Sequence, residues 1–312
     1  MIKSVPDVID RFRREGYICD PRIATTVFLA TRMQKPILAE GPAGVGKTEL
    51  AKVLAGSLNH ELIRLQCYEG LDESKALYEW EYAKQLLYTQ ILKDKISDTL
   101  QSATSLRKAL EKIEKEEDVF FSRRFILPRP LLKSIVSDQP TVLLIDEVDR
   151  ADQEFEAFLL EILSDFQISI PEIGTLKAKH IPLVVLTSNA SRELSDALKR
   201  RCLFLYLDFP SREREIEIVR LKIPGISESL AGEIVQLVQG LRQLDLKKRP
   251  SIGEVLDWAR ALLILNADRL EPNLVNETLN LILKYEGDIQ KARGEIQNFL
   301  PEPEKTGSKQ VH

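Results

Sequence analysis

The stretch that decides the fold is GPAGVGKT, residues 41–48, which fits the pattern G-x-x-x-x-G-K-[ST]. It lies between an apolar, strand-like run at residues 36–39 and a helix-like run at residues 49–55. In such a unit the backbone N–H groups of the loop and the positive end of the helix hold phosphate oxygens. The sequence therefore predicts a nucleotide-binding site.

The loop and the residue after it are the predicted nucleotide contacts. Lys47 would bridge the β- and γ-phosphates, and the Thr48 hydroxyl would ligate Mg²⁺. Glycine allows the backbone to approach a phosphate closely. The predicted contact residues are Gly41, Pro42, Ala43, Gly44, Val45, Gly46, Lys47, Thr48 and Glu49.

Acidic and amide side chains follow the apolar strands further along the chain. Asp146 and Glu147 come directly after the run at residues 142–145, and Asn189 ends the next run. The carboxyl ends of strands are where open α/β sheets bind ligands. We expect Asp146 to hold Mg²⁺ through water and Glu147 to orient the attacking water. Asn189 would contact the γ-phosphate or that water, although turn chemistry also places Asn at strand ends.

Two arginines, Arg200 and Arg201, close a helical run that begins near Glu193. The helix dipole favours basic residues at a helix C-terminus, so their presence there can be explained without any function. The functional interpretation is an arginine finger that reaches the nucleotide of a neighbouring subunit.

The order of elements indicates an α/β fold with a second, helical part. Buried strands alternate with helices up to about residue 209, which predicts a parallel sheet. A β-hairpin is expected at residues 166–176, inserted before a core strand. Past Pro210 only helix patterns remain, which predicts a nucleotide-binding core at 1–209, a helical lid domain at 210–300 and a disordered tail at 301–312.

Composition limits the classes of protein. The chain has 312 residues, 44% hydrophobic positions and a net charge of -4, which gives no broad footprint for nucleic acid. The three cysteines and three histidines show no disulfide framework or zinc-ligand spacing. Because no apolar run approaches the ~20 residues of a membrane span and no signal-peptide pattern starts the chain, we expect a cytoplasmic protein.

Taken together, the motifs resemble those of AAA+ ATPases of the MoxR family, and within it the CoxD-type proteins. The first resemblance is carried by GPAGVGKTE (41–49), LLIDEVDRADQEFEAFLLEILSDF (143–166), ISIPEIGTLKA (168–178), VVLTSN (184–189) and DALKRRCLFLYLDFP (196–210). The CoxD-type resemblance is carried by LIRLQCYEGLD (62–72), ALYEWEYAKQLL (76–87), RFILPRPLL (124–132) and EVLDWARAL (254–262).

This resemblance implies site roles for particular residues. It makes residues 41–48 Walker A, Asp146 and Glu147 Walker B, Asn189 sensor 1 and Arg201 the arginine finger, with Arg200 as the alternative. Where related ATPases place a sensor 2 arginine after a proline, this chain has Arg249 before Pro250. Arg249 would then contact the nucleotide from one position earlier.

The family also implies cofactors, partners and a function. ATP and Mg²⁺ would bind between core and lid, and the protein would form a homo-oligomeric ring, commonly a hexamer. MoxR-type ATPases act as chaperones beside von Willebrand A domain proteins, and CoxD-like members are linked to assembly of the molybdenum- and copper-containing site of carbon monoxide dehydrogenase. Two alternatives are a nucleotide-gated adaptor with negligible turnover and a DNA-directed motor, which the acidic balance disfavours.

Overall fold

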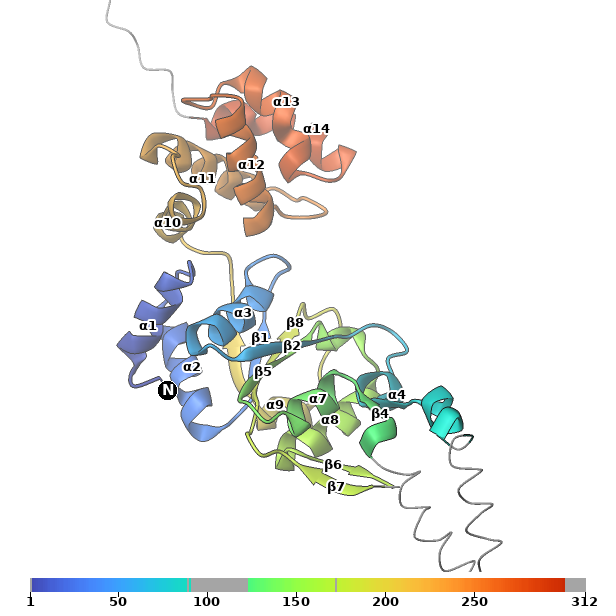
Figure 1. Ribbon diagram of the computed structural model, residues 1–312. Coiled ribbons are helices and arrows are strands. Elements are labelled where there is room, and N and C mark those ends of the chain that lie inside the picture. The colour runs from blue at the N-terminus through green and yellow to red at the C-terminus, as the bar shows by residue number, and fades with distance from the viewer. Residues whose placement is uncertain (1, 89, 91–122, 172, 301–312) are drawn as a thin grey trace, which may run out of the picture. The chain divides into compact units, whose positions relative to one another are not determined.

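The computed structural model describes residues 2–88, 90, 123–171 and 173–300. The predicted tail at 301–312 lies outside these residues. Residues 83–118 are dense in Lys, Glu, Leu and Ile, which predicts a helix, and most of that stretch also lies outside the described residues. The chain forms two compact units (Figure 1). Unit 1 comprises Met1–Val8, Arg22–Glu40 and Thr48–Leu205, and unit 2 comprises Ile9–Pro21, Gly41–Lys47 and the chain from Tyr206 onward.

A five-stranded sheet of order β2-β5-β8-β1-β9 positions the ends of the motifs. Its strands are β1 (Ile37–Glu40), β2 (Glu61–Gln66), β5 (Thr141–Asp146), β8 (Leu183–Ser188) and β9 (Leu203–Tyr206). The pairs β2–β5, β5–β8 and β1–β8 are parallel, as predicted. From β1 the chain goes on to β2 on one side of the sheet, and from β8 it goes on to β9 on the other side of β1. The strand order therefore reverses at the β1–β8 pair, and open α/β sheets bind ligands at such a reversal.

Both faces of the central strands are buried, which explains their continuous apolar runs. All six residues of β5 are buried. Leu143 and Ile145 of β5 join a core cluster with α7 (Pro130–Val136) and α8 (Gln153–Asp165). Val142 and Leu144, which point to the other face, are equally buried.

The remaining helices of the nucleotide-binding part begin where the sequence provides a cap or a proline. α2 (Pro21–Met33) starts at Pro21, and Asp152 caps α8 by accepting a hydrogen bond from the Phe155 N–H at 2.8 Å. Ser195 caps α9 (Asp196–Arg201) in the same way. The other elements are α1 (Val5–Arg14), α3 (Lys47–Leu58), α4 (Glu73–Ala76), η1 (Arg123–Phe125) and η2 (Val148–Arg150).

The predicted hairpin is present as β6 (Gln167–Ile170) and β7 (Gly174–Lys177), paired antiparallel. Ile168 and Leu176 face the core, and the Ser169 and Thr175 hydroxyls are hydrogen-bonded at 3.0 Å on the exposed face. This alternation is what fixes the hairpin register.

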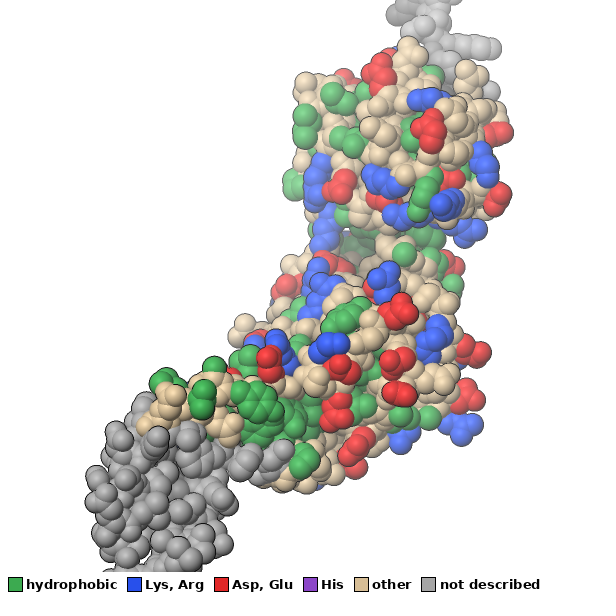
Figure 2. Space-filling view, turned by 90° about the vertical axis from the view of Figure 1, so that its right-hand side faces the viewer, with side chains coloured by type: hydrophobic (Ala, Val, Ile, Leu, Met, Phe, Trp, Pro, Cys, Tyr) green, Lys and Arg blue, Asp and Glu red, His purple; other side chains and the backbone are tan. Residues whose placement is uncertain are grey.

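A second antiparallel pair joins β3 (Tyr78–Trp80) and β4 (Ile126–Pro128). The rings of Tyr78 and Trp80 meet edge to face at 6.2 Å, so they share a face as expected for extended backbone. Tyr82 does not join them, because a helix begins at that residue. Its side chain is 71% exposed, and Leu86 and Leu87 on the same helical stretch are 60% and 55% exposed. Figure 2 shows that hydrophobic side chains gather on the surface beside the residues drawn in grey.

Unit 2 contains the helices expected past Pro210. They are α10 (Arg212–Lys222), α11 (Glu228–Gln243), α12 (Ile252–Ile264), α13 (Pro272–Ile282) and α14 (Glu286–Phe299). Trp258 is fully buried at their centre, and its indole N–H donates to Thr278 Oγ1 at 2.9 Å. The pattern of residues 275–299 predicts a single helix, but the backbone is extended at Leu283 and Tyr285. Asp288 at the start of α14 accepts hydrogen bonds from the N–H groups of Lys247 and Lys248.

Among the residues described, no helix combines the length and the apolar character needed to cross a membrane.

Candidate nucleotide site

The loop after β1 requires glycine at two positions for steric reasons. Gly41 has φ of 153°, and a Cβ there would lie 1.9 Å from the carbonyl oxygen of Leu207. Gly44 has φ of 78°, and a Cβ there would lie 2.1 Å from the Cβ of Ser251. No side chain fits at either place without moving the backbone. The predicted glycines are therefore part of the shape of the loop.

Lys47 is held against the loop that precedes it. Its side chain is buried, and its Nζ donates to the carbonyl oxygens of Gly41 at 2.7 Å and Pro42 at 2.6 Å. The ammonium group is therefore fixed against the backbone carbonyl groups at the start of the loop. Phosphate oxygens that reach this loop would meet a lysine whose position is already defined.

Asp146 is the centre of a buried hydrogen-bond network at the end of β5. It is 2% exposed, and its Oδ1 accepts from Thr48 Oγ1 at 3.0 Å and from Thr187 Oγ1 at 2.6 Å. Its Oδ2 accepts from Arg64 Nη2 at 2.6 Å. The network joins the first turn of α3 to the ends of three strands and brings the oxygens of Thr48 and Asp146 together.

Glu147 lies beside this network in a left-handed backbone conformation, with φ of 56° and ψ of 50°. Its N–H donates to Thr187 Oγ1 at 2.8 Å. Its carboxylate accepts from Gln66 Nε2 at 3.1 Å and from Asn189 Nδ2 at 3.3 Å. The side chain is 31% exposed, so a water molecule can reach the carboxylate. Its Oε2 also pairs with Arg150 Nε at 3.1 Å. Two neutral amides and one guanidinium thus hold the predicted catalytic carboxylate.

The donors at this site fit Mg²⁺ in the presence of a nucleotide. The described residues contain no group of three or more His, Cys, Asp or Glu side chains that would hold a metal by themselves. Mg²⁺ usually binds through one or two protein oxygens, with water and substrate phosphates completing its octahedron. The adjacent oxygens of Thr48 and Asp146 supply that number.

The turn after Asn189 is held by hydrogen bonds to the carboxylate of Asp149, a residue that is 3% exposed. Asp149 Oδ2 accepts from the Asn189 N–H at 3.2 Å, from the Ser191 N–H at 2.9 Å and from Ser191 Oγ at 2.6 Å. Burial raises the pKa of Asp149, but the hydrogen bonds from Ser191 and Asn189 outweigh it and the net pKa is lowered. The carboxylate therefore stays ionised at neutral pH.

A second buried carboxylate holds the rest of this segment. Glu156, on α8, is 1% exposed and pairs with Arg192 Nη2 at 2.5 Å. Its other oxygen accepts from the N–H of Ser195, the cap of α9, at 3.0 Å. The chain from Asn189 to α9 is thus fixed at both ends by carboxylates from the region that follows β5.

The candidate arginines lie on exposed surface. Arg201 Nε donates to Ser164 Oγ at 2.8 Å and its Nη1 to the Ala197 carbonyl at 3.3 Å. Arg200 is exposed and has no hydrogen-bond or ion-pair partner among the residues described. Arg249 is exposed and lies two residues before Ser251, the side chain that meets Gly44.

Sequence reasoning missed several polar residues of the site, namely Arg64, Gln66, Asp149 and Thr187. Arg64 and Gln66 lie on β2, whose place beside β5 depends on the strand order. Thr187 is two residues before Asn189 in an apolar run, and a hydroxyl among apolar neighbours at a strand end was the available signal.

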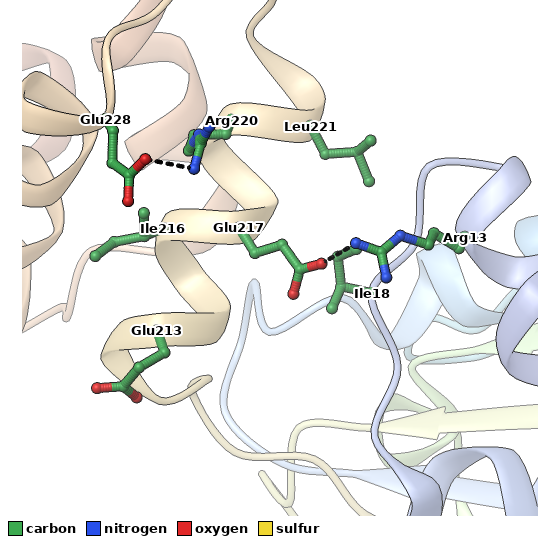
Figure 3. Close-up of a pocket in the computed structure, with 8 residues that line it drawn as sticks. All are labelled: Arg13, Ile18, Glu213, Ile216, Glu217, Arg220, Leu221 and Glu228. Carbon is green, nitrogen blue, oxygen red and sulfur yellow. Dashed lines mark hydrogen bonds and ion pairs between the residues drawn. The ribbon is translucent and has the colours of Figure 1, made fainter.

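A separate surface pocket of about 620 Å³ lies between α10 and the chain at the end of α1 (Figure 3). Arg13 pairs with Glu217, and Arg220 pairs with Glu228 at 2.9 Å. The pocket contains no residue predicted from the sequence to bind the nucleotide.

Residues 36–202 match the AAA domain (dynein-related subfamily). The gas vesicle ATPase GvpN of Haloferax mediterranei is 26% identical over 220 residues, which cover 67% of this chain and only 57% of that protein. GvpN1 of Halobacterium salinarum is 24% identical over 281 residues, or 86% of this chain and 75% of that protein.

Solved structures of Thermotoga maritima RuvB are also similar. A mutant form aligns with 20% identity and a TM-score of 0.47, covering 89% of this chain and 72% of that one. The form described as a Holliday junction branch migration motor aligns with 18% identity and a TM-score of 0.42 over the same shares.

The family match spans more than half of the chain and includes the loop at residues 41–48, Asp146, Glu147 and Asn189. The chain belongs to the AAA domain family, dynein-related subfamily, and its α/β core is an ATPase domain.

Proposed function

We propose that this protein is an ATP-driven remodelling enzyme of the MoxR type. The observation that carries the proposal is the placement of Glu147, held between the amides of Gln66 and Asn189 and next to an Asp146–Thr48 contact. A carboxylate aimed in this way suits the positioning of a water for attack on a phosphoryl group.

The residues would divide the work as follows. The loop N–H groups and Lys47 bind the phosphates, and Thr48 and Asp146 hold Mg²⁺, which neutralises phosphate charge when bound. Glu147 orients and polarises the water, and Asn189 fixes Glu147 and the water relative to the γ-phosphate. The remaining loop residues and Glu49 line the phosphates.

Arg201 is proposed as the finger that completes a neighbouring subunit's site in a ring, commonly a hexamer. Its exposure at the end of α9 supports this role, and the bonds to Ser164 and Ala197 define its present orientation. Arg200 is the alternative, because it is exposed and has no partner within the described part of the chain. Arg249 is proposed to sense the nucleotide, supported by its nearness in sequence to Ser251.

For the client we propose a metalloenzyme whose cofactor is matured with help from this ATPase, in particular a carbon monoxide dehydrogenase-like molybdenum enzyme, with a von Willebrand A domain protein as partner. The CoxD-type motifs at 62–72, 76–87, 124–132 and 254–262 support it. We place this activity in the cytoplasm. The relatives named as gas vesicle ATPases suggest a second kind of client, a protein of a gas vesicle.

The test is a pull-down with Glu147→Gln in ATP, compared with the same variant without nucleotide and with Lys47→Ala in ATP. ATP-dependent capture of a von Willebrand A protein or a metalloenzyme supports the maturation role. Capture of a gas vesicle protein would instead support that protein as the client. Capture of nucleic acid would favour the motor, and negligible turnover with the partner present would favour the nucleotide-gated adaptor.

A further inference from the structure

Two turns of the site share one anchor, and that anchor has no assigned role. The first turn follows Glu147, where η2 begins, and the second follows Asn189, where Ala190 has φ of 56°. Asp149 belongs to the first turn. Its carboxylate accepts hydrogen bonds from the backbone N–H groups of Asn189 and Ser191, the residues on either side of Ala190.

The contacts of Asp149 concentrate on a single oxygen. Oδ2 receives three hydrogen bonds, all from Asn189 and Ser191. Oδ1 is buried and has no hydrogen-bond partner among the described residues. Burying a carboxylate is unfavourable unless hydrogen bonds offset the lost hydration. Here the bonds that come from other residues all come from the turn that carries Asn189.

This anchor bears on a bond that is sensitive to small movements. The Asn189 amide reaches Glu147 at 3.3 Å, near the upper limit for a hydrogen bond. A left-handed backbone at a non-glycine residue such as Ala190 is unfavourable and persists only where surrounding contacts enforce it. If the turn relaxed, the backbone of Asn189 would rotate and its amide would leave Glu147.

We propose that Asp149 is a positioning residue for ATP hydrolysis, which holds the Asn189 turn so that the Asn189 amide can fix the Glu147 carboxylate. The inference rests on the roles proposed above for Glu147 and Asn189. Asp149 acts through Asn189 and does not itself touch the nucleotide, so nucleotide binding is insensitive to it.

The experiment is a double-mutant cycle on the full chain, with kcat, the ATP dissociation constant and the melting temperature as readouts. Asp149→Ala should lower kcat roughly 10- to 100-fold, the scale of a misplaced catalytic group. Its ATP dissociation constant should match the wild type. In an Asn189→Ala background, Asp149→Ala should lower kcat little further, because the amide it positions is already gone.

Two variants show whether geometry or charge matters. Asp149→Asn retains an oxygen that can accept the same three bonds, so most of the activity should return. Ser191→Ala removes one bond from an exposed residue and should have a small effect in the same direction, and it serves if Asp149→Ala does not fold. The matched control is Asp152→Ala, because Asp152 is exposed and accepts a hydrogen bond from a backbone N–H of α8 instead of the Asn189 turn.

An unchanged kcat in Asp149→Ala would overturn the inference. So would an equal further loss of kcat in the Asn189→Ala background, because that result describes a purely structural carboxylate. If Glu147→Gln or Asn189→Ala hydrolyses ATP at the wild-type rate, the proposed function fails instead.

Discussion

At the scale of single residues, the site depends on hydroxyl and amide groups that the motifs do not name. Thr187 donates to Asp146 and accepts from the N–H of Glu147, so one hydroxyl connects both acids. Lys47, Asp146 and Glu147 could be predicted, because phosphate and magnesium chemistry requires charged groups at these motif positions, whereas the charged Arg64 and Asp149 were missed. Thr187 could not be predicted, because its role follows from which side chain of β8 faces β5.

Glu147→Gln should bind ATP with near wild-type affinity and lose most of its turnover. The amide fills the same space but is a poor acceptor for the proton of the attacking water, so a loss of about 10²-fold or more is expected. Nucleotide titration and phosphate release measure the two effects. Glu154→Gln, on the exposed side of α8, is the control; normal phosphate release by Glu147→Gln would remove the assignment.

Thr187→Val should destabilise the protein as well as slow it. The substitution nearly preserves shape but leaves the Glu147 N–H and one bond of Asp146 unpaired, which costs about 1–3 kcal/mol. Thr187→Ser retains the hydroxyl and is the control. Chemical denaturation measures the difference, and equal stability of the Val and Ser variants would contradict the shared role of the hydroxyl.

The cysteines should resist alkylation in the folded protein. Burial raises the pKa of Cys202 to about 12, and burial together with the negative charge of Asp146 raises that of Cys67 to about 12. Cys19, with its pKa raised to about 11, is less buried. Raised pKa values leave only a trace of reactive thiolate at pH 8, so alkylation should be slow until denaturant is added. Fast labelling of Cys67 or Cys202 without denaturant would contradict the burial of these two thiols in the folded protein.

At the scale of elements, strand ends were predictable and helix breaks less so. The ends of β1, β5 and β8 were found because an apolar run followed by Gly, Asp or Asn marks a strand meeting a ligand edge. The division between α13 and α14 was missed. Its cause is tertiary, since Asp288 is buried and accepts N–H groups from the loop near Lys247. Gln66 was missed because its use depends on β2 lying next to β5.

The α10–α11 contact provides a stability test in the helical unit. Glu215 is fully buried and accepts from both terminal nitrogens of Arg242, at 2.7 and 2.8 Å, while Arg242 Nε donates to the Pro250 carbonyl. Glu215→Ala leaves a buried guanidinium unpaired and should cost about 3–5 kcal/mol. The exposed pair is the control: Glu228→Ala, opposite Arg220, should cost under about 1 kcal/mol. Similar losses in the two variants, measured by denaturation, would contradict this difference.

At the scale of the whole molecule, the proposed ring makes a prediction that a monomeric enzyme would not. Lys47→Ala should abolish nucleotide binding in its own subunit, and Arg201→Ala should remove the arginine finger that we propose is offered to a neighbouring subunit. Each variant alone should be inactive, and their mixture should regain turnover, because some interfaces combine an intact loop with an intact finger. Arg200→Ala tested in the same way decides between the two arginines. If no mixture regains activity, the sites are not shared between subunits.

The left-handed backbone of Glu147 has an evolutionary consequence. A residue other than glycine or asparagine in this conformation lowers the stability of the folded chain, by roughly 1 kcal/mol. A lineage selected only for abundance would therefore drift toward glycine or asparagine at this position and lose turnover as it gained stability. A glutamate retained here in descendants of the protein would mark selection for hydrolysis, and its replacement would identify the copies in which hydrolysis is no longer under selection.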